Sequence, residues 1–159
     1  MTVQLSKNFT WEEFKYSSTA EAKKISNNPS EEDKIVRNAK ALCEKVLQPL
    51  RDAYGPITIS SGFSCPTLAL LLGRKVTSQH CLGEAADIVS SKVPNFTLFK
   101  FIRQNLVYDQ LIYEVRKRKD GSLYDWVHVS YKARGNNRMM ALYSPASGGY
   151  TGKLPDKGI

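Results

Sequence analysis

The alternation of apolar and polar positions along the chain predicts both helices and strands. In residues 30–50, apolar residues recur at spacings of three and four: Ile35, Ala39, Leu42, Val46 and Leu50. This spacing places them on one face and predicts an amphipathic core helix. Pro29 and Ser30 open the segment, and the acidic residues that follow suit the positive end of a helix dipole. The turn "YGP" predicts the end of this helix near residue 54.

Three other segments carry helical signals. In "FTWEEFKYSS", Thr10 and Glu13 have the spacing of a capping box at a helix start. The apolar segment "CPTLALLLG" begins a short helix at Pro66 and ends it at Gly73. The segment "NFTLFKFIRQNL" predicts a further helix, because its apolar residues share one face: Leu98, Phe101, Ile102 and Leu106.

Four segments have the features of strands: "ITISSGF", "AADIVS", "YDQLIYEVRKR" and "YDWVHVSYK". Asp120-Gly121, between the last two, is a strong hairpin signal. We therefore expect residues 1–143 to form a single α+β domain, with a small antiparallel sheet flanked by helices. Residues 144–159 are rich in Gly and Pro and lack periodicity, which predicts a loose C-terminal tail.

Composition narrows the class of protein. The net charge of +8 suits an anionic partner, although plain solubility accounts for it equally well. No apolar run approaches the roughly 20 residues of a membrane span, so we expect no membrane insertion. The N-terminus has no secretory signal pattern. The three cysteines include no C-x-x-C pair, which argues against a disulfide framework and a cysteine-rich zinc site. Since no nucleic-acid-binding motif is present, we expect no nucleic-acid partner.

The two histidines of the chain, His80 and His128, are the strongest chemical signal. Asp87 follows His80 by seven residues, in a run of small and apolar residues. Imidazole and carboxylate groups are both good zinc ligands, and a His-Asp-His set leaves one position open, as in catalytic zinc sites. The alternative is a hydrogen-bonded His–Asp pair. His128 favours the metal site, because an unpaired imidazole on a buried strand would be costly.

The segments "SGF", "SQHCLGEAADI", "DQLIYE" and "WVHVSY", in this order, closely resemble the zinc D-Ala-D-Ala carboxypeptidase family. This family shares its fold with hedgehog-type domains and many phage endolysins, and the resemblance extends to about Tyr143. It implies a hedgehog/DD-peptidase-like fold and one Zn²⁺ per chain, held by His80, Asp87 and His128. It also implies cleavage of peptide bonds in the stem peptides of bacterial peptidoglycan.

Two carboxylates compete for the role of general base. Glu114 ends "DQLIYE", and a hairpin about Asp120-Gly121 would place it opposite His128 or its immediate neighbour. Asp125 lies three residues before His128, where the family often has a catalytic carboxylate. On a regular strand this odd offset points Asp125 to the other face, unless a bulge or the strand end turns it inward. We favour Glu114, with an ion pair to Lys117 or Arg116 as the alternative role of Asp125.

The substrate side departs from the family. The family commonly has S-G-Y-R-S after the first strand, with an arginine that helps to hold the substrate, whereas this chain has "SGFSC" with Ser64 in that place. Arg138 or Arg74 could substitute, or either could be a surface charge. Trp126 flanks His128 and could line the substrate cleft or lie buried on the opposite face. The candidate substrate-binding residues are Ser64, Arg138 and Trp126.

These observations favour a monomeric zinc peptidase that acts on peptidoglycan stem peptides or cross-links, as a D,D-carboxypeptidase or an endopeptidase. The alternative is a catalytically weak, zinc-containing cell-wall-binding module, which the change at Ser64 supports. The substrate lies outside the cytoplasm, although the sequence has no secretory signal pattern. A phage or prophage enzyme that stays in the cytoplasm until release would reconcile the two.

Overall fold

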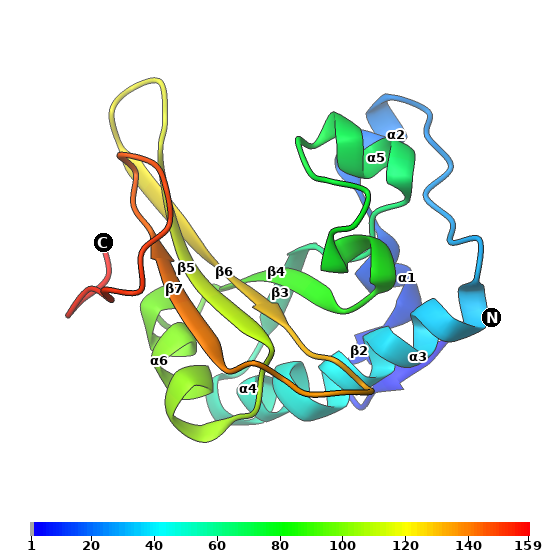
Figure 1. The fold of residues 1–159 in the computed structure, drawn as a ribbon, viewed down its shortest axis with the longest axis horizontal. Helices are drawn as coiled ribbons and strands as arrows, with labels where there is room; N and C mark the ends of the chain where they lie inside the picture. The colour runs from blue at the N-terminus through cyan, green and yellow to red at the C-terminus, as the bar shows by residue number, and fades with distance from the viewer. Residues whose placement is uncertain (1) are drawn as a thin grey trace.

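The computed structural model describes residues 2–159, which are built around a sheet of five strands in the order β3-β4-β6-β5-β7 (Figure 1). The strands are β3 (Ile57–Ser61), β4 (Ala85–Ser90), β5 (Gln110–Lys117), β6 (Leu123–Ser130) and β7 (Met140–Ser144). The expected β5–β6 hairpin is present, and β3, β4, β6 and β5 pair antiparallel. The α+β class is therefore confirmed.

The five-stranded sheet also contains one parallel pair of strands, so it is mixed. The sequence did not predict β7, and this strand pairs with β5 in parallel, with Gln110 opposite Met140. The reason is topological. The chain leaves β6 at the end of the sheet where β5 begins, and residues 131–139 cross that end before β7 starts. The new strand therefore runs in the same direction as β5.

The remaining elements flank this sheet. They are β1 (Gln4–Ser6), β2 (Phe9–Thr10), α1 (Trp11–Lys15), α2 (Ser18–Ala22), α3 (Glu32–Leu42), η1 (Cys43–Leu47), α4 (Gln48–Tyr54), α5 (Pro66–Leu71), η2 (Gln79–Leu82) and α6 (Asn95–Asn105). Strands β1 and β2 form a separate two-stranded sheet. Thr10 caps α1, since its Oγ1 accepts a hydrogen bond from the Glu13 backbone N–H at 3.2 Å, as the sequence predicted.

The predicted core helix runs without a break through α3, η1 and α4. All five residues of its predicted apolar face are buried: Ile35, Ala39, Leu42, Val46 and Leu50. The middle turn, η1, is a π-helical turn. Pro49 accounts for it, because proline has no N–H for the α-helical bond and its ring would clash with the carbonyl of Lys45. The wider turn lets the helix continue across the proline.

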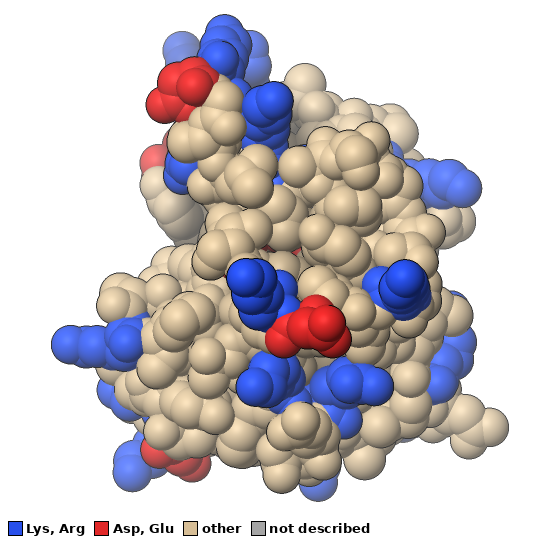
Figure 2. All heavy atoms as spheres, turned by 90° about the vertical axis from the view of Figure 1, so that its left-hand side faces the viewer, with Lys and Arg blue, Asp and Glu red and all other residues tan. Residues whose placement is uncertain are grey.

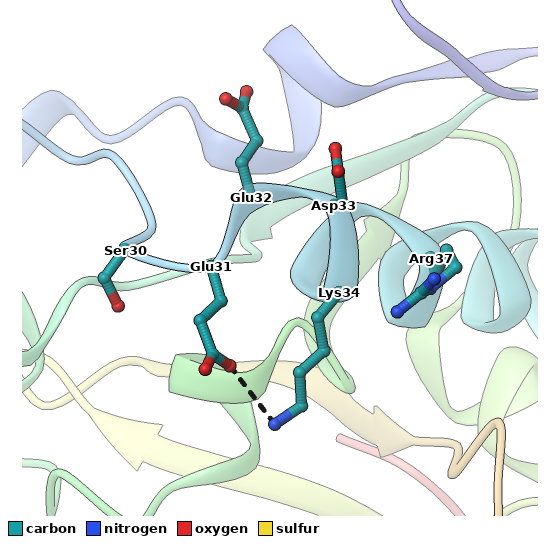
Figure 3. Close-up of a pocket in the computed structure, with 6 residues that line it drawn as sticks. All are labelled: Ser30, Glu31, Glu32, Asp33, Lys34 and Arg37. Carbon is teal, nitrogen blue, oxygen red and sulfur yellow. Dashed lines mark ion pairs between the residues drawn. The ribbon is translucent and has the colours of Figure 1, made fainter.

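The first turn of α3 and the two residues before it line an open, charged surface pocket (Figure 3). Glu32 and Asp33 lie in this turn, as expected for the positive end of the dipole. Glu31 forms an exposed ion pair with Lys34 at 3.3 Å (Figure 3). The groups are exposed and of both signs, so we assign this pocket no function.

The two faces of β5 and β6 differ in character. On one face, apolar residues pack against α6, with Phe96 and Phe99 in contact with Tyr113. On the other face lie Glu114, Trp126 and His128, which line a cleft. The tip of the β5–β6 hairpin projects beyond the sheet (Figure 1), and Figure 2 shows Lys and Arg side chains gathered at that end of the molecule. The sheet thus separates the hydrophobic core from a polar cleft.

The segment after β7 has neither helices nor strands, but it contacts the domain at three places. Thr151 forms an antiparallel bridge with Tyr143, Leu154 packs against the core, and the Ile159 N–H donates to the Tyr113 hydroxyl at 3.1 Å. The predicted division into a domain of residues 1–143 and a loose tail stays a prediction. Among residues 2–159, no helix has both the length and the apolar character needed to cross a membrane.

Candidate metal centre

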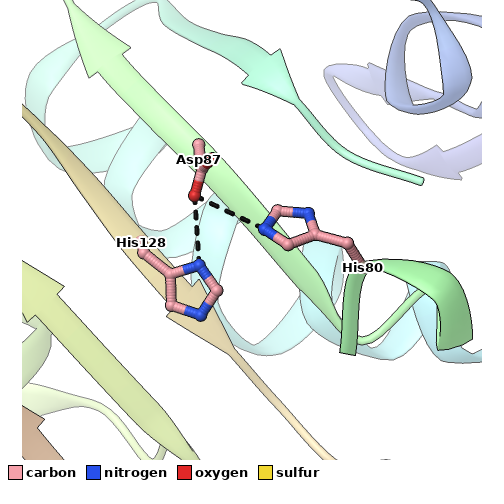
Figure 4. Close-up of side chains that lie close together, drawn as sticks. All are labelled: His80, Asp87 and His128. Atoms are coloured by element: carbon pink, nitrogen blue, oxygen red, sulfur yellow. Dashed lines mark hydrogen bonds and ion pairs between the residues drawn. The ribbon is translucent and has the colours of Figure 1, made fainter. Parts of the chain in front are cut away.

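His80, Asp87 and His128 converge on one point at the floor of the cleft (Figure 4). Asp87 on β4 and His128 on β6 are directly paired in the antiparallel ladder. Asp87 Oδ1 lies 3.1 Å from His128 Nδ1 and 3.5 Å from His80 Nε2. One ligand atom from each residue lies within 4.8 Å of the other two. The structure thus brings together all three predicted ligands.

The turn η2 delivers His80 to the strands. Ser78 caps this turn by accepting a hydrogen bond from the His80 backbone N–H at 3.2 Å. Gly83 ends it in the left-handed conformation, with φ +72°. A Cβ at Gly83 would lie only 2.6 Å from the carbonyl oxygen of Ile35, so the glycine is required by both conformation and space. The chain can therefore pass close to α3 and enter β4 directly after His80.

The donor set fits a cation. His80 Nδ1 lies 2.8 Å from the carbonyl oxygen of Gly62, an acceptor, so Nδ1 carries the proton and Nε2 presents its lone pair to Asp87. Burial lowers the pKa of His80, which keeps the ring neutral. Burial disfavours a charged carboxylate at Asp87, but the hydrogen bond with His128 and the closeness of the His80 ring outweigh this effect and lower the pKa of Asp87. A lone pair facing a carboxylate needs a positive charge between them, as a metal ion would provide.

Comparison with known proteins agrees with this geometry. A model of the family described as peptidase M15 matches residues 7–130. The chain belongs to the peptidase M15 family. Members of this family are zinc metallopeptidases, so the chain is a hydrolase that acts on peptide bonds. A search of curated proteins found no match. The matched region contains the three candidate metal ligands and both candidate bases.

Glu114 lies in the cleft, but not directly opposite His128. The register pairs Glu114 with Trp126 and Ile112 with His128, so Glu114 is a diagonal neighbour of His128 on the same face. Its Oε1 accepts from Arg116 Nη2 at 3.3 Å. Burial raises the pKa of Glu114, and the negative charge of Asp87 raises it further. A carboxylate with a raised pKa in the cleft of an M15 peptidase is suited to proton transfer.

Asp125 lies on the opposite face of β6. It pairs with Val115 in an uninterrupted register, so no bulge turns it towards the cleft. Its carboxylate accepts hydrogen bonds from Asn95 Nδ2, at 3.0 Å, and from the Tyr113 hydroxyl. These contacts, rather than an ion pair with the hairpin, hold Asp125 against α6. The structure therefore places the two candidate bases on different sides of the sheet.

Arg74 reaches Ser64, the position at which the resemblance implies an arginine. Ser64 is fully buried, and its Oγ accepts from Arg74 Nη1 at 2.9 Å. Arg74 Nη2 donates to Ser61 Oγ at 3.1 Å and to Asp87 Oδ2 at 3.0 Å. The M15 peptidase thus has a guanidinium group beside its candidate metal ligands, on the loop after α5. Gly73, with φ +77°, makes the turn into this loop.

Arg138 does not enter the cleft. Its Nε and Nη2 donate to the two oxygens of Asp109 at 3.0 and 2.8 Å, and its backbone N–H donates to Asp109 Oδ1 at 2.9 Å. Asp109 is fully buried and also accepts from Gln79 Nε2 at 3.0 Å. Burial alone would raise the pKa of Asp109, but the hydrogen bonds from Arg138 and Gln79 lower it to about 2. This network braces the residue next to His80.

The cleft contains residues that sequence reasoning missed or left open. Trp126 lies on the His128 face and lines the cleft, which decides between its two predicted positions. Its indole N–H is buried and makes no hydrogen bond, although it is close enough to Glu114 to favour the charged carboxylate. Arg116 and Tyr150 also line the cleft. Tyr150 lies outside the matched region, and no sequence pattern marked it.

Proposed function

We propose that this M15 peptidase binds one zinc ion per chain and, as a monomer, hydrolyses peptide bonds in the stem peptides or cross-links of bacterial peptidoglycan. His80, Asp87 and His128 would hold the ion. The observation that carries the proposal is the convergence of these three groups, with Glu114 and Arg74 in the same cleft. The choice of zinc rests on the family and on a donor set of two imidazoles and one carboxylate.

The protein groups divide the chemistry between them. When bound, zinc polarises the scissile carbonyl and makes a water molecule more acidic. Glu114 would take a proton from the attacking water as the water oxygen adds to the carbonyl carbon. The same carboxyl then protonates the amine nitrogen as the C–N bond breaks, so the proton is conserved. The Arg116 guanidinium, at 3.3 Å, keeps the Glu114 carboxylate in position.

Arg74 supplies the substrate contact. Its guanidinium already donates to Asp87 and two serines, which fixes its direction. The same fork suits a carbonyl or a carboxylate oxygen of the peptide. A free C-terminal carboxylate at this position would make the enzyme a D,D-carboxypeptidase, whereas a backbone carbonyl would make it an endopeptidase. The resemblance to phage endolysins supports action on the wall after release from the cytoplasm of a phage-infected or lysogenic cell.

A second candidate function is a zinc-containing cell-wall-binding module with little turnover. The observation that favours it is the set of three hydrogen bonds that Arg74 already makes, one of them to a metal ligand. An arginine engaged in this way is less free to hold a substrate. Under this alternative, the metal organises a binding cleft rather than a reaction.

The test combines metal content with product analysis. The purified protein is loaded with zinc, dialysed, assayed for metal and incubated with defined cross-linked and linear muropeptides, whose products are identified by mass spectrometry. We expect about one zinc per chain, loss of most of it in His128→Ala, and one cleaved peptide bond. Zinc without turnover on any muropeptide would favour the binding module. Full zinc retention by His128→Ala would overturn the ligand assignment.

A further inference from the structure

One end of the cleft has aromatic rings that are held by arginine side chains. Trp126 lines the cleft itself, and Tyr124 continues the same face of β6 towards the hairpin tip. Their rings are nearly parallel, at 22°, with centroids 5.8 Å apart. Arg116 lies over the Trp126 ring at 5.3 Å, and Arg118 lies over the Tyr124 ring at 4.8 Å. These cation–π contacts fix both rings in place.

A third aromatic residue reaches this end from the segment after β7. Tyr150 lines the cleft and is 62% exposed. The backbone on both sides of Tyr150 is held, because Gly149 O accepts from Ser144 Oγ at 2.9 Å and Thr151 exchanges two hydrogen bonds with Tyr143. The exposed ring is therefore presented by a fixed turn and not by a free end.

The same anchor connects this turn to the catalytic side of the cleft. Ser144 is buried, and its Oγ accepts from Arg116 Nη1 at 3.1 Å. Arg116 in turn pairs with Glu114. The segment after β7 is thus part of the construction of the cleft, although it lies outside residues 7–130. Its contribution is a property of this chain and not of the family model.

We propose that Trp126, Tyr124 and Tyr150 form a saccharide subsite, which binds the glycan disaccharide next to the stem peptide. This inference rests on the proposed function, because it concerns the substrate of the same cleft. Aromatic rings combine a large apolar face with polar edges, and the C–H face of a pyranose ring packs against such a surface.

The arrangement separates two kinds of recognition. Arg74 and the metal ligands lie at the ionic end of the cleft, where the scissile peptide bond would bind. At the aromatic end, on the hairpin side, the charged groups are already engaged: Arg116 pairs with Glu114 and lies over Trp126, and Arg118 lies over Tyr124. A neutral sugar ring suits this end better than a second charged peptide group. The enzyme should therefore prefer substrates that keep the disaccharide attached.

The experiment uses two substrates that differ only in the disaccharide: a disaccharide stem peptide and the same free stem peptide. For the parent protein we expect a KM about three- to tenfold lower with the sugar attached, because the aromatic rings add contact area for the sugar. Tyr150→Ala and Tyr124→Ala should raise KM mainly for the sugar-bearing substrate and so reduce the preference. Tyr16→Ala, an exposed tyrosine outside the cleft, is the matched control and should keep the preference.

A second readout needs no hydrolysis. The chain has two tryptophans, of which Trp11 is buried in the core and Trp126 lines the cleft. Titration with peptide-free N-acetylglucosaminyl-N-acetylmuramic acid should change the tryptophan fluorescence saturably, and Tyr150→Ala should weaken the affinity about three- to tenfold. Far-UV circular dichroism and the melting temperature confirm that the variants are folded.

The two readouts separate the failure of this inference from that of the proposed function. Disaccharide binding that depends on Tyr150, without hydrolysis of any muropeptide, would support the subsite and overturn the peptidase proposal. Hydrolysis with equal KM for the two substrates, and no binding of the disaccharide, would overturn the subsite alone. An equal loss with both substrates in Tyr150→Ala would show that this residue contacts peptide, which also overturns the saccharide assignment.

Discussion

Arg74 donates to Asp87 Oδ2 at 3.0 Å, on the carboxylate oxygen that neither histidine contacts. The two oxygens of Asp87 therefore have different roles, since Oδ1 faces His80 and His128. A hydrogen bond to the outer oxygen of a ligating carboxylate fixes its orientation and tunes its affinity for metal. Both side chains are largely buried, with 20% and 13% exposed, so water screens this contact only weakly.

Arg74→Gln should weaken metal binding, because it removes the charge that orients Asp87. We expect the dissociation constant for zinc to rise by roughly 10- to 100-fold, the usual effect of losing an outer partner of a metal ligand. Competition with a chromophoric chelator measures this dissociation constant. Arg103→Gln, an exposed position on α6, is the control. An unchanged zinc affinity in Arg74→Gln would mean that Asp87 is positioned without it.

Replacement of each carboxylate distinguishes the two candidate bases. Glu114→Gln should keep its zinc, since the amide fills the same volume and the ligands remain, and hydrolysis should fall by roughly 10²- to 10⁴-fold. Asp125→Asn should keep most activity, because Asp125 lies on the α6 face. It should cost about 1 kcal/mol of stability through its weakened bonds to Asn95 and Tyr113.

Activity on a defined muropeptide and a urea titration give the two quantities. A large loss of turnover in Asp125→Asn, with Glu114→Gln near the parent, would reverse the assignment. It would also require β6 to distort when substrate binds, because the register shows no irregularity before His128.

Reintroduction of the family arginine should harm this chain. Ser64 is fully buried and its Oγ is already bonded to Arg74, so Ser64→Arg would bring a second guanidinium into occupied space. We expect a loss of about 1–3 kcal/mol from overpacking, with more from charge repulsion. The double variant Ser64→Arg/Arg74→Ser should recover part of that loss, which thermal melting would show.

Ser60→Arg, at an exposed position of β3, is the control. A stable and more active Ser64→Arg would mean that Arg74 does not replace the arginine.

The sequence was sufficient for those parts of the site that depend on local patterns. The helix over residues 30–50 was predictable because the spacing of its apolar residues matches the face that packs against the core. His80, Asp87 and His128 were predictable as a group because their motif lies on two paired strands and on the turn before one of them. The diagonal position of Glu114 could not be derived, because the register depends on how the hairpin closes. Arg118 N–H donates to Ser122 O and Gly121 N–H to Arg118 O, and this closure pairs Glu114 with Trp126.

Contacts between distant segments were beyond the reach of sequence patterns. Arg138 and Asp109 are 29 residues apart, and nothing in "GNNRMM" indicates that this arginine binds a buried aspartate instead of substrate. Strand β7 was missed because "MALYS" is short and lacks polar alternation, and a parallel partner is not marked by a turn. Tyr150 was missed for a related reason, since its place in the cleft depends on the bridge between Tyr143 and Thr151.

The buried Asp109 should make the stability of the enzyme sensitive to acid. Its pKa is lowered to about 2 in the folded protein, against about 3.9 for an unperturbed aspartate. A lowered folded pKa contributes stability above the unfolded value, and this contribution is lost as the pH falls from about 5 to 2. Asp109→Asn should therefore cost about 2 kcal/mol at pH 7 and much less at pH 2. Urea titrations of parent and variant across this pH range measure the difference.

Glu44→Gln, which removes only an exposed ion pair with Lys40, should change stability by less than about 1 kcal/mol at every pH. A difference between Asp109→Asn and the parent that does not depend on pH would show that the loss comes from packing rather than from the charge.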